Sequence, residues 1–182
     1  MTDPALTEKK INSTNVFSGR LLNVYSDEIE LPDGNKAGRE YIMHVGAVCI
    51  VALTDDNKVI VERQYRYPMR QVTLEIPAGK LDSKEEDPLD AAKRELREET
   101  GAIADKITYL GKFYPTPAYS DEIIYMYLAE GLHFEAQSLD EDEFLTVQLV
   151  PINELADAII AGNVPDGKTQ AAVLAVCRKL GL

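Results

Sequence analysis

Three glutamates, Glu95, Glu98 and Glu99, stand at positions i, i+3 and i+4 of one short segment. If the segment is a helix, this spacing gathers the three carboxylates on one face, while Leu89 and Leu96 share another. Carboxylates this close repel one another. A divalent cation would relieve that repulsion. Mg²⁺ suits a pair of helix carboxylates, because it keeps waters and substrate phosphate oxygens among its ligands.

A solvated charged face is the competing interpretation of such a glutamate-rich helix. Arg94 can pair with Glu98 at i+4, which still leaves Glu95 and Glu99 side by side. The residues alone therefore leave both interpretations open.

The surrounding segment, residues 79–102, resembles the Nudix signature Gly-x5-Glu-x7-Arg-Glu-U-x-Glu-Glu-x-Gly-U, in which U is aliphatic. The matching residues are Glu86, Arg94-Glu95-Leu96, Glu98-Glu99 and Gly101-Ala102. Six residues rather than five separate Gly79 from Glu86, so the loop before the helix carries one extra residue. Either Glu85 or Glu86 can therefore take the place of the first glutamate.

This resemblance implies an α/β fold, namely a Nudix-like α/β/α sandwich with a mixed sheet. It also implies a metal-dependent hydrolase that uses Mg²⁺, with Mn²⁺ as the alternative. The residues that match the family's metal ligands are Glu95, Glu99 and the backbone carbonyl of Ala78. Glu98 is implied as a further metal-binding or catalytic carboxylate.

Segments outside the signature resemble the ADP-ribose pyrophosphatase branch of the family. They are Gln64–Arg66, Leu74–Gly79, Thr116–Ala118, Asp140–Phe144 and Asp166–Thr169. The branch implies hydrolysis of ADP-ribose to AMP and ribose 5-phosphate. Two alternatives stay open: cleavage of another nucleoside-diphosphate sugar or of NADH, and binding of ADP-ribose without cleavage.

Substrate contacts are implied for Arg39, Arg66, Glu75 and Pro117. Arg63 is a further candidate, although a surface ion pair is the competing interpretation for it. Guanidinium groups suit a diphosphate because they donate hydrogen bonds in a planar fork and stay charged.

The acidic stretch 140–143 holds the candidates for activating water. Glu141 and Glu143 lie between strand-like segments, where a flexible loop can bring a base to the substrate, and an ordinary solvated loop is the competing interpretation. The resemblance favours Glu143, then Glu141, either as the base or as a ligand of a further metal.

The composition narrows the partners and the compartment. The net charge of −12 argues against nonspecific binding to nucleic acid or to an anionic membrane, since both need clustered Lys and Arg. The sequence has no apolar run of roughly 18 residues and no secretory signal at its N-terminus. Cys49 and Cys177 fit core positions, so a cytoplasmic protein without disulfides is expected.

The chain is expected to form two parts. Residues 1–45 are predicted as a small antiparallel β subdomain after a loose polar start, with strands at 19–30 and 37–45 around a turn at 32–35. Residues 46–182 are predicted as the hydrolase domain. Its expected strands are 47–53, 58–65, 72–76, 107–113, 122–129 and 146–150, and its helices are 87–100, 152–161 and 168–179. An isolated hairpin is only marginally stable, so the subdomain is expected to form a homodimer, as related enzymes do.

Overall fold

The structure, a computed structural model, describes residues 3–139 and 144–182. The chain divides into two compact units. The first unit comprises residues 1–44 and 116–122, and the second comprises residues 45–115 and 123–182. The segment 116–122 therefore belongs with the N-terminal strands although it lies far from them in the sequence.

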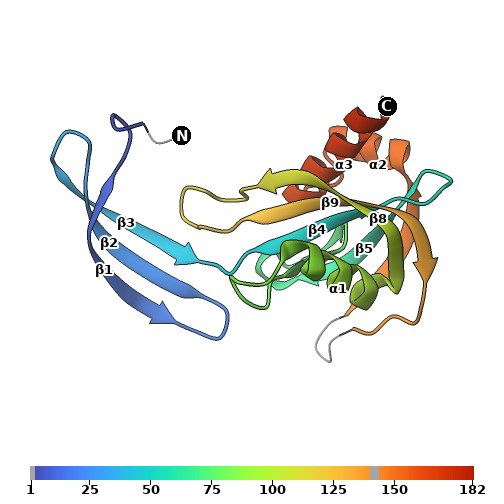
Figure 1. Ribbon diagram of the computed structural model, residues 1–182, viewed down its shortest axis with the longest axis horizontal. Helices are drawn as coiled ribbons and strands as arrows, with labels where there is room; N and C mark the ends of the chain where they lie inside the picture. The colour runs from blue at the N-terminus through green and yellow to red at the C-terminus, as the bar shows by residue number, and fades with distance from the viewer. Residues whose placement is uncertain (1–2, 140–143) are drawn as a thin grey trace. The chain divides into compact units, whose positions relative to one another are not determined.

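The first unit is built on an antiparallel sheet in the order β1-β2-β3 (Figure 1). Its strands are β1 (Lys9–Ser18), β2 (Asn23–Glu30) and β3 (Lys36–Met43). The expected hairpin of β2 and β3 is present, with Gly34 at a φ of 86° in the turn. Strand β1 was not expected. All ten of its residues are exposed, so backbone pairing with β2, and not a buried apolar face, defines it.

The described residues of the second unit form two sheets. The four-stranded sheet has the order β7-β4-β9-β8 and consists of β7 (Ala78–Lys80), β4 (Ala47–Ala52), β9 (Ile124–Phe134) and β8 (Ala102–Phe113). It is mixed, because β4 and β9 run parallel while the other pairs are antiparallel. The three-stranded sheet has the order β10-β5-β6 and consists of β10 (Leu145–Pro151), β5 (Lys58–Arg66) and β6 (Gln71–Glu75). A single 3₁₀ turn, Tyr67–Met69, joins β5 to β6.

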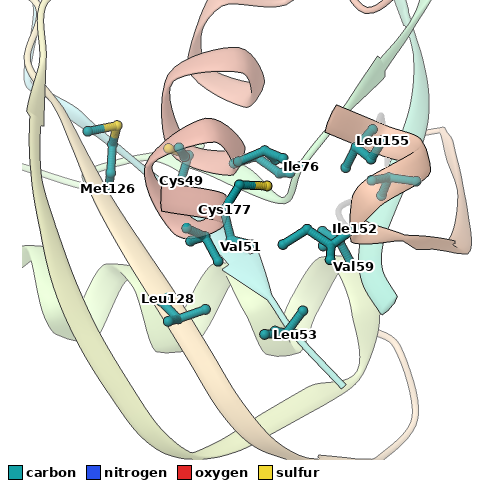
Figure 2. Close-up of a cluster of buried hydrophobic side chains, with 14 of the residues drawn as sticks. Cys49, Val51, Leu53, Val59, Ile76, Met126, Leu128, Ile152, Leu155 and Cys177 are labelled. Atoms are coloured by element: carbon teal, nitrogen blue, oxygen red, sulfur yellow. The ribbon is translucent and has the colours of Figure 1, made fainter. Parts of the chain in front are cut away.

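Strand β4 lies at the centre of the core and buries both of its faces. Val48 and Ile50 pack with the helix α1 (Pro88–Thr100). Cys49 and Val51 point the other way, into a cluster with α2 (Ile152–Ile160) and α3 (Gly167–Leu180). Figure 2 shows this second cluster, in which Cys177 of α3 lies close to the β4 side chains. Helices thus cover both faces of a mixed sheet, as the sequence predicted.

Helix α1 begins and ends as its sequence indicates. The Asp87 carboxylate accepts a hydrogen bond from the backbone N–H of Leu89 at 2.8 Å, which is an N-cap. Gly101 closes the helix with a φ of 70°, a left-handed conformation that favours glycine. Within the described part of the chain, no helix has the length and apolar character needed to cross a membrane.

Candidate active site

The carboxylate of Glu95 lies directly over Gly79 of β7. A Cβ atom added at Gly79 would stand 1.9 Å from the Cδ of Glu95, so only glycine leaves room for this side chain. A side chain at position 79 would push the carboxylate away from the strand.

The second glutamate of this group, Glu99, is held against the neighbouring residue of the same strand. Its side chain accepts a hydrogen bond from the backbone N–H of Ala78 at 2.9 Å, and the residue is only 3% exposed. Glu95 and Glu99 therefore reach two adjacent residues of β7, Ala78 and Gly79, from two successive turns of α1.

Arg94 ties the charged face of α1 to the loop before it. Its Nη1 lies 2.6 Å from Glu95 and 3.5 Å from Glu98, and its Nη2 lies 3.3 Å from Glu86. The Arg94–Glu98 pair was expected, but the shorter contact with Glu95 was not. Burial lowers the pKa of Arg94, yet the neighbouring carboxylates outweigh burial and raise that pKa above its usual value.

The loop geometry also decides which residue acts as the first glutamate of the signature. Glu86 pairs with Arg94 and accepts a hydrogen bond from the backbone N–H of Asp82 at 2.6 Å. Glu86 thus anchors the loop to the helix, and the extra residue is taken up between Gly79 and this contact.

The donor set fits a hard divalent cation. Among residues 3–139 and 144–182, no group of three or more acidic, histidine or cysteine side chains forms a ready-made metal site. Glu95 and Glu99, held at the Ala78–Gly79 strand, instead offer two carboxylates beside a backbone segment. This is the open arrangement that suits Mg²⁺, which takes only one or two protein carboxylates and fills its remaining positions with water and phosphate oxygens.

A second charged cluster surrounds Glu75, at the end of β6. Arg66 donates to both oxygens of this carboxylate, from Nε at 2.7 Å and from Nη2 at 2.6 Å. Lys168 and Thr73 donate to it as well. Burial raises the pKa of Glu75, but the hydrogen bonds from Arg66, Lys168 and Thr73 and the charge of Lys168 outweigh burial and hold that pKa at about 2.

The two clusters are electrostatically linked. The pKa of Arg66 is raised first by its hydrogen bond to Glu75, against an opposing effect of burial, and the charges of Glu75, Asp166 and Glu99 add to it. The negative charge of Glu99 on α1 therefore adds to that of Glu75 in raising the pKa of Arg66.

The structure does not bring Arg63 together with Arg66 and Glu75. Successive side chains of a strand point to opposite faces, so Arg63 faces away from Glu62 and Arg66 on β5. Glu75 stands directly opposite Glu62 in the register, which places it on the Arg66 face.

Arg39 and Pro117 both lie in the first unit. Arg39 is on β3, where its Nε donates to the carboxylate of Glu8 at 3.0 Å. The loop that carries Pro117 is bound to the same strand, because the N–H of Ile42 donates to the carbonyl of Tyr119 at 2.9 Å.

The two candidates for activating water, Glu141 and Glu143, lie outside the described residues. Both flanks of their segment are described. On one side the backbone N–H of Ser138 donates to the carbonyl of Glu98 at the end of α1. On the other side Leu145 begins β10 opposite Gln64 of β5.

Lys168 and Thr73 were not predicted as site residues. Lys168 was only part of the Asp166–Thr169 resemblance, and its side chain is 11% exposed between Glu75 and Asp166. A buried ammonium needs carboxylate partners, but the burial of Lys168 depends on tertiary packing, so no signal in the sequence marked it.

Comparison with known proteins identifies the family. The model of the NUDIX domain matches residues 43–172. The chain is 42% identical to the ADP-ribose pyrophosphatase of Bacillus subtilis, over 93% of this chain and 92% of the relative. It is also 42% identical to the methanol dehydrogenase activator of Bacillus methanolicus, over 91% and 90% of the two chains.

The crystal structure of an ADP compounds hydrolase has the same fold. It superposes with a TM-score of 0.85 at 26% identity and covers 99% of this chain and 97% of its own. The expected α/β fold and the resemblance to the ADP-ribose pyrophosphatase branch are confirmed. With its signature helix in place against β7, this chain belongs to the Nudix family.

Proposed function

We propose that this protein hydrolyses the diphosphate bond of ADP-ribose to AMP and ribose 5-phosphate. One observation carries the proposal: Glu95 and Glu99 of α1 are held at the Ala78–Gly79 strand, an open arrangement that suits a divalent cation. A cation held there and the guanidinium of Arg66 would then act on the same diphosphate. The similarity to the pyrophosphatase of Bacillus subtilis supports ADP-ribose as the substrate.

Glu95, Glu99 and the carbonyl of Ala78 would hold Mg²⁺, or Mn²⁺ in its place, and Glu98 stands beside them. A cation at this position would supply positive charge to the diphosphate and would make water a better nucleophile. Gly79 leaves the space in which Glu95 lies, and the N–H of Ala78 fixes Glu99, so the protein orients both carboxylates before metal arrives.

Glu143, or else Glu141, would take the proton from the attacking water. The attachments of the flanking residues support this assignment. The chain is bound to the end of α1 at Ser138 and begins β10 beside β5 at Leu145.

Arg66 would bind the diphosphate, and Arg39 and Pro117 would contact the rest of the substrate. We leave Arg63 out of this set because it faces the other side of β5 from Arg66. The proposed location is the cytoplasm, and the two free, buried cysteines agree with a reducing compartment.

The proposed assembly is a homodimer formed through the N-terminal sheet of residues 9–43. Strand β1 is exposed along its whole length, and Ile11, Val16 and Phe17 on it are large apolar residues in contact with solvent. Such a strand gains stability from a partner surface. Sedimentation equilibrium should give twice the mass of the chain, and an active monomer would contradict the dimer.

A panel of nucleoside-diphosphate sugars with Mg²⁺ tests the substrate. ADP-ribose should be cleaved with the highest kcat/KM, and AMP and ribose 5-phosphate should appear in equal amounts. Faster cleavage of another sugar nucleotide or of NADH would make that compound the assigned substrate in place of ADP-ribose. Binding of ADP-ribose without release of AMP would leave only a binding role.

A second candidate function comes from the relative in Bacillus methanolicus, which is named as an activator of methanol dehydrogenase. Adding this protein to a purified methanol dehydrogenase would test it. The Glu99→Gln variant is the informative comparison: activation that survives in this variant would separate the activator role from hydrolysis.

A further inference from the structure

The Glu75 carboxylate already receives as many hydrogen bonds as its two oxygens commonly accept. Oε1 accepts from Arg66 Nε at 2.7 Å and from Thr73 at 2.5 Å, and Oε2 accepts from Arg66 Nη2 at 2.6 Å and from Lys168. An ionised carboxylate offers about four acceptor positions. Glu75 is therefore an anchor for protein donors and has no position left for a metal ion or a sugar hydroxyl.

Arg66 has N–H donors that its contact with Glu75 does not use. A guanidinium carries about five N–H donors in a fixed plane, and the contact with Glu75 uses one on Nε and one on Nη2. The side chain is 41% exposed, whereas that of Glu75 is only 4% exposed. A two-point contact with a buried carboxylate fixes the guanidinium plane and presents its remaining donors to solvent.

Lys168 holds the anchor in place from a different element. It lies at the start of α3, where the capping carboxylate of Asp166 accepts from Lys168 Nζ at 3.1 Å. The next residue, Thr169, accepts a hydrogen bond from the backbone N–H of Ile76 at 2.9 Å. The first turn of α3 is thus bound both to the Glu75 side chain and to the backbone of the following residue.

We propose that Lys168, acting through Glu75, is a positioning residue that fixes the Arg66 guanidinium for the substrate diphosphate. The inference rests on the proposed function, in which Arg66 binds that diphosphate. Without Lys168, Glu75 would keep one cationic partner instead of two, and its carboxylate could turn with Arg66. Arg66 would then lose orientation, while the carboxylates of α1 would keep theirs.

The decisive experiment is a double-mutant cycle of Lys168→Met and Arg66→Ala. Four quantities are measured: KM and kcat for ADP-ribose, the Mg²⁺ concentration for half-maximal activity, and the affinity for the non-hydrolysable α,β-methylene analogue of ADP-ribose. Lys168→Met should raise KM and weaken the analogue roughly tenfold, as loss of an outer supporting residue does. The Mg²⁺ requirement should stay unchanged. In the Arg66→Ala background the same change should have little further effect.

Two control variants distinguish loss of the positioning contact from a general loss of structure. Lys168→Arg keeps a cation within reach of Glu75 and should restore KM to near the wild-type value. Lys106→Met removes a lysine from an exposed pair with Glu130 and should change none of the four quantities. If Lys168→Met does not fold, Thr73→Val removes one neutral hydrogen bond from the same carboxylate and should give a smaller change of the same kind.

The outcomes distinguish this inference from the proposed substrate. Additive effects of Lys168→Met and Arg66→Ala would overturn the positioning role. So would a shift in the Mg²⁺ requirement with KM unchanged, which would make Glu75 part of the metal site. Coupled effects measured on a different nucleoside-diphosphate sugar would keep the positioning role and refute ADP-ribose.

Discussion

The two carboxylate clusters of the second unit balance their charge in opposite ways. On α1, the single guanidinium of Arg94 lies within 4 Å of four carboxylates, those of Asp82, Glu86, Glu95 and Glu98. At the end of β6, two cations, Arg66 and Lys168, share Glu75. The first cluster holds an excess of negative charge, which a divalent cation reduces. The second is already neutralised by protein groups.

This difference separates two tasks. Carboxylates that bind a cation repel one another when the cation is absent. The glutamates on one face of α1 are close enough for this repulsion. A group that must hold another side chain still has to be satisfied in every state, because an unpaired buried charge is expensive. Glu99 and Glu75 are both 3% exposed, so burial alone does not distinguish the two roles. Their partners do.

The largest effect is expected from Glu99→Gln, which removes one negative charge from the metal-binding face. The amide keeps an oxygen for the N–H of Ala78, so the fold should persist. Activity in Mg²⁺ should fall by roughly 10²-fold or more. Steady-state kinetics with a melting curve would measure both. The control is Glu130→Gln, at an exposed pair with Lys106, and near wild-type turnover in Glu99→Gln would remove Glu99 from the metal site.

A smaller loss is expected from Gly79→Ala. The added methyl group would meet the Glu95 carboxylate, which is the end of a flexible side chain and can move away. The Mg²⁺ concentration for half-maximal activity should rise by roughly 10- to 100-fold with little change in stability.

Gly38→Ala is the matched control for Gly79→Ala, because the nearest atom to an added Cβ there is 4.0 Å away. A metal titration followed by activity would compare the two variants. An unchanged requirement for Mg²⁺ in Gly79→Ala would mean that Glu95 does not need its place over the strand.

Glu75→Gln should act on stability, with a characteristic dependence on pH. The pKa of Glu75 is about 2 in the folded protein, below the ordinary glutamate value of 4.5, so its ionisation favours folding. The stabilisation is fully present above pH 4.5 and is lost as pH falls toward 2. At pH 7 the variant should lose on the order of 3 kcal/mol of unfolding free energy. Urea unfolding at several pH values would measure this loss, and a difference from wild type that does not shrink at low pH would contradict it.

The sequence predicted the first cluster better than the second, for a physical reason. Glu95 and Glu99 lie on one helix, so a fixed period of 3.6 residues places them together. Glu75 and Lys168 come from β6 and α3, and only tertiary packing brings them into contact. No local pattern in the sequence predicts that contact.

The same contrast holds for the fold. The core strand β4 was predictable because its residues form one continuous apolar run. Helix α1 was predictable because Asp87 and Gly101, which cap its two ends, are residue types typical of those positions. Strand β1 was missed because all of its residues, polar and apolar, are exposed and it has no buried face. Strands β8 and β9 extend beyond their expected limits to Ala102 and Phe134, where they pair with each other along residues that, apart from the buried Ala102, are exposed or half-buried. Pairing of this kind depends on the partner strand, and it produces no alternation of apolar and polar residues in the sequence.

The smallest effect is expected from Arg63→Ala, set against Arg66→Ala. These arginines are three residues apart on β5, but their side chains leave opposite faces of the sheet, and only Arg66 meets Glu75. Arg66→Ala should raise KM for ADP-ribose by roughly tenfold or more, since it removes a charge-assisted contact with phosphate. Arg63→Ala should change KM by less than about twofold, as expected of an exposed surface residue. Equal effects in the two variants would show that the substrate reaches both faces of β5, and the side of the sheet on which the diphosphate binds would have to be reassigned.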